Sequence, residues 1–207
     1  AMNRRLTYYA YPTMELTVTH PKAKRGCPGC AVQPPKEILW LEGTVLKTSR
    51  IYRDVHYSGG IPYKEHLWFC IRQDNVFWSE HPSMYFQIEP EGGSFGFIHY
   101  APKAALMNLH RKKLLEKPEA FLSIVEQLEK DGRFVDQSTR YKRPKPGGTP
   151  ELEHWYQLKN CFFQQEIPVG DALFDPKLPE VLADGFRTLE PMYDYFRSLE
   201  LELSREE

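Results

Sequence analysis

Apolar and polar residues alternate along the chain from residue 38 to residue 100. Alternation with a period of two predicts half-buried β-strands, and no helical pattern separates one such run from the next. We therefore expect a mainly antiparallel sheet, because antiparallel strands need only short connections. The predicted strands cover residues 38–47, 49–57, 65–72, 84–89 and 94–100, and a Pro-Glu-Gly-Gly hairpin signal joins the last two.

The period lengthens to that of a helix after residue 101. Pro102 and Pro118 stand where the first turn of a helix tolerates proline. The clearest apolar stripe runs from Leu178 to Phe196 in steps of three and four, and Pro191 within it is expected to restart or kink that helix. These patterns predict helices near 102–116, 118–131 and 177–203, a short helix at 151–156, and further strands near 133–142 and 159–167.

Length and composition support one folded unit. We predict an α+β domain over residues 1–207, with a mainly antiparallel sheet, helices packed on one face and a C-terminal amphipathic helix. The 207 residues are 41% hydrophobic and 14% aromatic, which is typical of a soluble globular protein with a bulky core. Neither a membrane-spanning run nor a secretory segment is present, so we expect a cytoplasmic protein with no membrane partner.

Charge is unevenly distributed. Basic residues outnumber acidic ones by 11 to 5 in residues 1–72 and by 11 to 6 in residues 101–150. Acidic residues prevail by 4 to 0 in residues 73–100 and by 13 to 5 in residues 151–207. In one interpretation, the basic and acidic blocks face each other across the fold or form ordinary solvated surfaces. In the other, the two basic blocks together build a basic concavity. A pI near 6.7 and the lack of a nucleic-acid motif argue against a nucleic-acid partner.

The four cysteines include one C-x-x-C motif, formed by Cys27 and Cys30. A structural zinc needs two more ligands, and no second motif supplies them, although His20, Cys70 and Cys161 are alternatives. A redox disulfide is disfavoured because the flanking sequence is typical of a loop. We expect four reduced thiols, no bound metal and no cofactor.

The stretch from Ser49 to Trp68 holds the densest group of ionisable side chains in predicted strands. Strand alternation places Arg53 on the same face as Ile51 and Val55. If that face is buried, the guanidinium must meet a carboxylate or a bound anion, because an unpaired buried charge costs several kcal/mol. We therefore predict a buried and paired Arg53.

Six separated motifs, in order and spacing, resemble a largely microbial family catalogued only as a domain of unknown function, family 2461. The resemblance covers about residues 48–197, implies an α+β fold and brings no established activity. The motifs are Ser49–Asp54, Pro62–Trp68, Met84–Pro90, Tyr141–Arg143, Trp155–Asn160 and Phe186–Tyr193.

The chain departs from the family pattern in two places. His56–Ile61 replaces part of a basic loop with glycines, which puts a role for those charges in doubt. Residues 1–40 do not resemble the helix that usually opens the family. They are a divergent N-terminal segment, a truncation or a misread gene segment.

Three functions fit these residues. The first is binding of a small anionic ligand, such as a phosphorylated one, in a basic pocket, because the arginine fork suits phosphate and carboxylate. The second is a non-catalytic module whose basic face docks an acidic partner, with the same arginines exposed. The third is a metal-dependent enzyme that uses Asp54, His56 and His66. A structural ion-pair network is the alternative for all three. The predicted ligand-binding residues are Arg50, Arg53, Tyr63, Lys64, Lys142 and Arg143.

Overall fold

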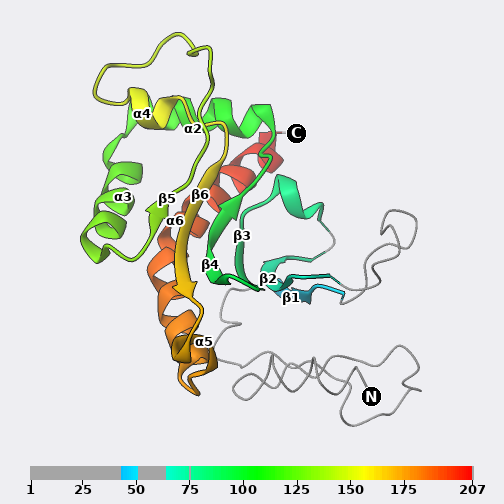
Figure 1. The fold of residues 1–207 in the computed structure, drawn as a ribbon. Helices are drawn as coiled ribbons and strands as arrows, with labels where there is room; N and C mark the ends of the chain where they lie inside the picture. The colour runs from blue at the N-terminus through cyan, green and yellow to red at the C-terminus, as the bar shows by residue number, and fades with distance from the viewer. Residues whose placement is uncertain (1–42, 51–63, 75, 207) are drawn as a thin grey trace.

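The computed structural model describes residues 43–50, 64–74 and 76–206. Within these residues, six strands form one sheet in the order β1-β2-β3-β4-β6-β5, and each neighbouring pair is antiparallel. Figure 1 shows the strands side by side in this order. They are β1 (Thr44–Thr48), β2 (Leu67–Gln73), β3 (Ser83–Glu89), β4 (Gly92–His99), β5 (Val135–Asp136) and β6 (Cys161–Pro168).

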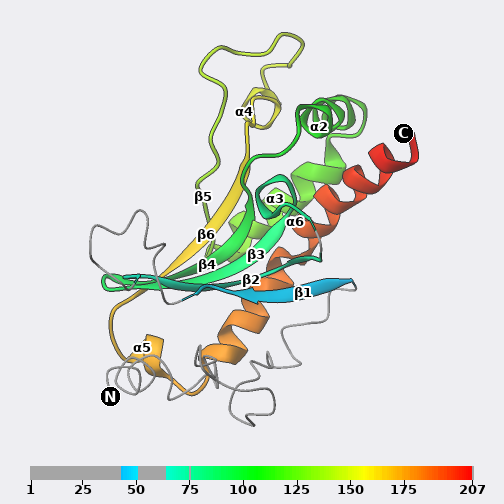
Figure 2. The same ribbon diagram turned by 90° about the vertical axis from the view of Figure 1, so that its right-hand side faces the viewer.

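The long helices lie on one side of this sheet, with α6 crossing the strands (Figure 2). This arrangement confirms the predicted α+β fold with an antiparallel sheet and a C-terminal helix. Helix α6 continues through Pro191 without interruption. The helices are the 3₁₀ turn η2 (Trp78–Glu80), α2 (Ala104–Glu116), α3 (Glu119–Asp131), α4 (Glu153–Tyr156), α5 (Asp171–Phe174) and α6 (Leu178–Glu206).

Strands β4 and β6 lie close together at a point where β4 carries a glycine and therefore no side chain. A Cβ atom added to Gly96 of β4 would lie 2.0 Å from the carbonyl oxygen of Phe163 in β6. At the β3–β4 turn, Gly92 has a φ of +151°, which side-chain-bearing residues rarely adopt. The two glycines therefore fix the hairpin and the contact between β4 and β6.

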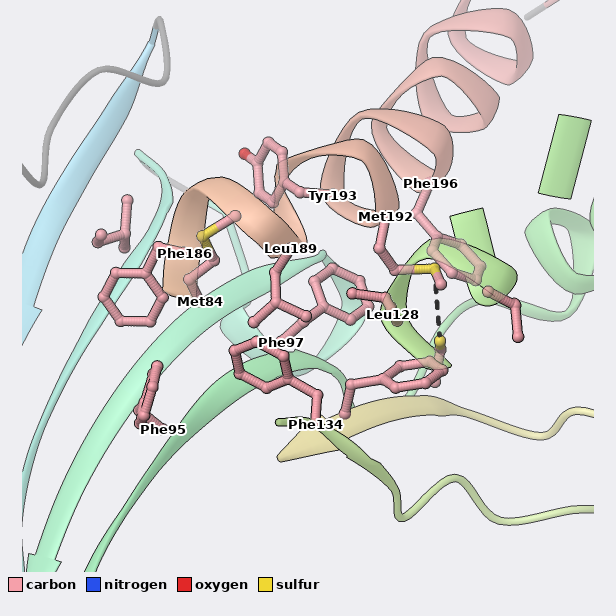
Figure 3. Packing of buried hydrophobic residues seen from close by; sticks show 14 of the residues in the cluster. Met84, Phe95, Phe97, Leu128, Phe134, Phe186, Leu189, Met192, Tyr193 and Phe196 are labelled. Carbon is pink, nitrogen blue, oxygen red and sulfur yellow. Dashed lines mark hydrogen bonds between the residues drawn. The ribbon is translucent and has the colours of Figure 1, made fainter. Parts of the chain in front are cut away.

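The core lies between the sheet and α6 (Figure 3). Phe186 of α6 is 0% exposed, and its ring centroid lies 5.8 Å from that of Phe95 in β4 and 6.3 Å from that of Phe69 in β2. Phe196 lies further along the same helix. Its ring stacks on that of Phe97, with the two ring centroids 5.9 Å apart. The apolar stripe in the sequence is therefore the face by which α6 binds the sheet.

The region predicted as a strand near 133–142 contains only a two-residue strand, Val135–Asp136, and an isolated bridge between Arg140 and Leu158. The strand ends early because the Asp136 carboxylate accepts a hydrogen bond from the backbone N–H of Ser138 over 2.8 Å. Such a side-chain bond turns the backbone away from the ladder.

Two cysteines lie in the described residues, and both are buried free thiols, Cys70 and Cys161. The Cys161 sulfur lies 4.0 Å from that of Met192 on α6 (Figure 3). Burial raises the pKa of Cys161, so this thiol is held in its neutral form. The pair Cys27 and Cys30 lies outside the described residues, so the expectation about these two stays a prediction.

Candidate functional site

The predicted site residues fall into three groups. Arg53, Asp54, His56 and Tyr63 lie outside the described residues, so the burial of Arg53 stays a prediction. His66 is exposed just before β2. The remaining four cations lie within the described residues and are compared next.

The structure does not bring these four cations together. Arg50 follows β1 and Lys64 precedes β2, at the end of the strand pair where Thr48 faces Phe69. Lys142 and Arg143 follow the bridge between residues 140 and 158, beside the start of β6 at the other edge and the other end of the sheet. The described members of the predicted set therefore do not line one pocket.

A buried arginine on α2 marks a different site. Arg111 is 6% exposed, although it carries a permanent charge. Its guanidinium donates to the backbone oxygen of Tyr156 over 3.0 Å, to that of Leu158 over 3.2 Å, and to Asn108 Oδ1 over 3.0 Å. These acceptors are neutral, so within the described residues no carboxylate balances the charge of Arg111.

A second cation shares an aromatic ring with Arg111. The Cζ atom of Arg111 lies 5.3 Å from the ring centroid of Tyr141, and the Nζ atom of Lys145 lies 4.9 Å from the same centroid. The π-face attracts each cation, but the two positive charges repel one another. An anion between them would relieve this repulsion.

Lys145 belongs to a loop over residues 140–148, here called the basic loop, which is fastened to α4. The Gln157 side chain accepts from the Lys145 N–H over 2.8 Å and donates to the Lys145 carbonyl over 2.9 Å. The Tyr156 hydroxyl donates to the Pro146 carbonyl over 2.9 Å. Gly147, at a φ of +105°, sits against the same hydroxyl. These bonds hold the basic loop in place above Arg111.

Arg140, at the start of the basic loop, is already neutralised. Its Nη2 lies 2.6 Å from Asp136 Oδ2, and it also contacts the His154 ring nitrogen. Burial by itself would raise the pKa of Asp136, but hydrogen bonds from Ser138 and Arg140 outweigh burial and hold this pKa below its usual value. The free positive charge of the site therefore comes from Arg111, Lys145 and the exposed residues between Arg140 and Lys145.

Sequence reasoning missed Arg111 and Lys145, although a signal for Arg111 was present. Met107, Arg111 and Leu114 are spaced by four and three residues, so the arginine falls within the apolar stripe of its helix. All three are buried. An arginine on a buried apolar face needs a partner for its charge. This reasoning, which was applied to Arg53 on a predicted strand, holds equally for Arg111 on this helix.

A metal centre finds no support in the part of the chain that the structure describes. Those residues contain no group of three or more histidine, cysteine, aspartate or glutamate side chains placed to hold an ion. Among the helices described, none is both long enough and apolar enough to cross a membrane.

Fold and site together define an α+β protein in which helices back an antiparallel sheet and a basic loop covers a buried arginine. The chain matches the family model described as Conserved hypothetical protein (DUF2461) over residues 36–195, and it belongs to this family. The match confirms the resemblance carried by the six motifs. Comparisons with curated proteins and with solved structures gave no match. The predicted divergent segment 1–40 lies outside the described residues, and it stays a prediction together with the single domain.

Proposed function

We propose that this protein binds a small anionic ligand, such as a phosphorylated metabolite, at the basic-loop site formed by Arg111, Tyr141, Lys142, Arg143 and Lys145. The observation that supports this function is the buried guanidinium of Arg111, which has no counter-ion among the described residues. A buried charge without a partner costs several kcal/mol, so a protein that keeps one gains from an anion beside it.

The chemistry of the site suits a phosphate or a carboxylate. A guanidinium has five N–H donors, and Asn108, Tyr156 and Leu158 accept from three of those of Arg111, which leaves two for a ligand. The Lys145 ammonium supplies a second charge from the basic loop. Because Gln157 binds the backbone of Lys145 on both sides, the loop is ordered before a ligand arrives, which lowers the entropic cost of binding.

The test is thermal unfolding in inorganic phosphate and in a sugar phosphate, each compared with chloride at equal ionic strength. A ligand at 100 times its Kd stabilises the folded state by about 2.7 kcal/mol. We expect a phosphate-specific rise in Tm for the wild type that the double variant Arg143→Ala/Lys145→Ala loses.

The matched control is Lys112→Ala, which removes an exposed lysine of α2 that pairs with Glu116 outside the loop. It should respond like the wild type. An equal response in the double variant, or no specific response in the wild type, would refute the proposal.

The exposure of Lys142 and Arg143 favours a second function, docking of an acidic protein partner. Figure 1 shows the loop that precedes α4 extending beyond the helices around it. Fluorescence anisotropy with a labelled polyglutamate peptide separates the two functions. Tight peptide binding that is lost in the double variant, without a phosphate response, supports docking. A phosphate response with weak peptide binding supports the small ligand.

A further inference from the structure

A second polar cluster lies at the end of the sheet where β4 ends and β3 begins. His81 comes just before β3, and Glu200 faces it from α6. The His81 Nδ1 atom lies 2.9 Å from Glu200 Oε1, and Arg197 Nη1 donates to the other carboxylate oxygen over 2.9 Å. The Glu200 side chain is only 9% exposed. A buried carboxylate therefore stands between an imidazole and a guanidinium.

The cluster contains buried polar atoms that lack hydrogen bonds. They are His81 Nδ1, Glu200 Oε1 and Nδ1 of His99, the last residue of β4. The first two are in contact but are not aligned as a hydrogen bond. His99 is 0% exposed, and its other nitrogen donates to the Glu80 carbonyl over 2.8 Å. Each unsatisfied buried group costs about 1–3 kcal/mol. Their presence in one place indicates a role beyond packing.

The position of Glu200 determines which nitrogen of His81 is available. A carboxylate accepts, so the proton of the neutral ring belongs on Nδ1, and Nε2 carries the free lone pair. The His81 side chain is 22% exposed while its Nδ1 is buried, so the exposed part of the ring faces away from Glu200. Catalytic bonds of this kind are often poorly aligned before a substrate binds.

An aromatic surface belongs to the same two segments of chain. The rings of Trp78 and Tyr100 lie 5.6 Å apart with a tilt of 30°, and the two residues are 49% and 56% exposed. The backbone N–H of Ala101 donates to the Ser79 carbonyl over 2.6 Å, which ties η2 to the end of β4. Trp78 opens η2, and His81 is the residue that directly follows this turn, with the backbone already extended at φ -124° and ψ 150°. Exposed aromatic pairs stack well with flat rings.

We propose that His81 is a proton-transfer residue of a second site, which takes a flat ring compound carrying an acidic hydroxyl. The ring lies on Trp78 and Tyr100. The hydroxyl O–H bond breaks, its electron pair stays on the oxygen, and the proton forms a new N–H bond at His81 Nε2. Glu200 balances the resulting imidazolium charge, and Arg197 holds that carboxylate in place. This site is independent of the basic loop.

The experiment uses p-nitrophenol, whose neutral and anionic forms absorb at different wavelengths. At a pH where the free probe is mainly neutral, we expect the wild-type protein to produce a saturable rise in phenolate absorbance. His81→Gln should abolish the rise, and Trp78→Ala should weaken probe binding by about tenfold, which corresponds to about 1.4 kcal/mol. Lys130→Ala, which removes an exposed lysine of α3 that pairs with Glu126, is the matched control and should behave like the wild type.

A second measurement does not depend on the probe or on a variant at His81. The ¹⁵N chemical shifts of the His81 ring in the wild type should show the Nδ1–H tautomer, and Glu200→Gln should shift it toward Nε2–H. The proposal is overturned by an Nε2–H tautomer in the wild type. It is equally overturned when the wild type gives no phenolate signal, or when that signal survives in a folded His81→Gln variant.

Discussion

Acid should destabilise this protein well above the pH at which carboxylates titrate, because two histidines are buried in their neutral form. His110 on α2 is 0% exposed, its Nε2 donates to the Trp155 carbonyl over 3.3 Å, and its Nδ1 accepts from the Tyr195 hydroxyl over 3.0 Å. His99 is also 0% exposed. Burial lowers the pKa of each histidine to about 4, against the opposing effect of one backbone hydrogen bond.

The magnitude follows from the difference between folded and unfolded pKa values. An unfolded histidine titrates near pH 6.5, so between about pH 6.5 and pH 4 the unfolded chain binds more protons than the folded protein. The stability from neutral burial is therefore complete above about pH 6.5 and is lost as the pH falls toward 4. Each histidine costs about 2 kcal/mol at pH 5 and about 3 kcal/mol at pH 4.

Urea unfolding at pH 7 and at pH 5, followed by circular dichroism, measures this loss. We expect the free energy of unfolding to fall by about 4 kcal/mol in the wild type, and by about 2 kcal/mol in His110→Gln or His99→Gln. The exposed His66→Gln is the matched control and should fall like the wild type. A wild-type loss below about 1 kcal/mol, or a full loss in both buried variants, would refute the reasoning.

Three further predictions concern packing and the basic loop. Phe186→Ala should lower the free energy of unfolding by about 3–5 kcal/mol in urea, and a near-neutral effect would contradict the core assignment. Gly96→Ala should destabilise by more than about 2 kcal/mol, because the new Cβ meets the Phe163 carbonyl oxygen and the two strands must separate. Gln157→Leu should leave Tm within a few degrees of the wild type but speed tryptic cleavage after Lys142, because the loop loses its backbone bonds. Unchanged cleavage would show that the glutamine does not hold the loop.

The elements of the fold could be predicted from the sequence because each has a local cause. The apolar steps from Leu178 to Phe196 match the buried face of α6. In β3, Met84 and Phe86 are buried and Tyr85 is partly exposed, as the period of two requires. Among the described residues, the strand near 133–142 was overestimated, because the hydrogen bond between Asp136 and Ser138 leaves no trace in hydrophobic periodicity. The predicted strand over 49–57 lies outside the described residues except for residues 49 and 50, which are not in a strand.

The basic-loop site depends on information that a residue pattern does not hold. The burial of Arg111 follows from helical spacing, but its partners do not. Its guanidinium binds carbonyl groups of residues 156 and 158, about 45 positions further along the chain. Such contacts appear only once α4 is placed against α2, since backbone carbonyls carry no sequence signature.

A pocket that joins Arg50 and Lys64 to Lys142 and Arg143 requires a particular order of the strands. Strands β1 to β4 form a meander with two edges, β1 and β4, and β6 could pair with either. Lys142 would lie near Arg50 if β6 paired with β1. In the structure β6 pairs with β4 instead, and eight residue pairs from Gly92 to His99 fix this register. Gly96 makes this pairing possible, because its missing side chain lets the β6 backbone approach β4 more closely than a residue with a Cβ atom would permit. The pairing of β6 with β4 therefore needs a glycine at this contact, and the resulting strand order separates the two basic regions.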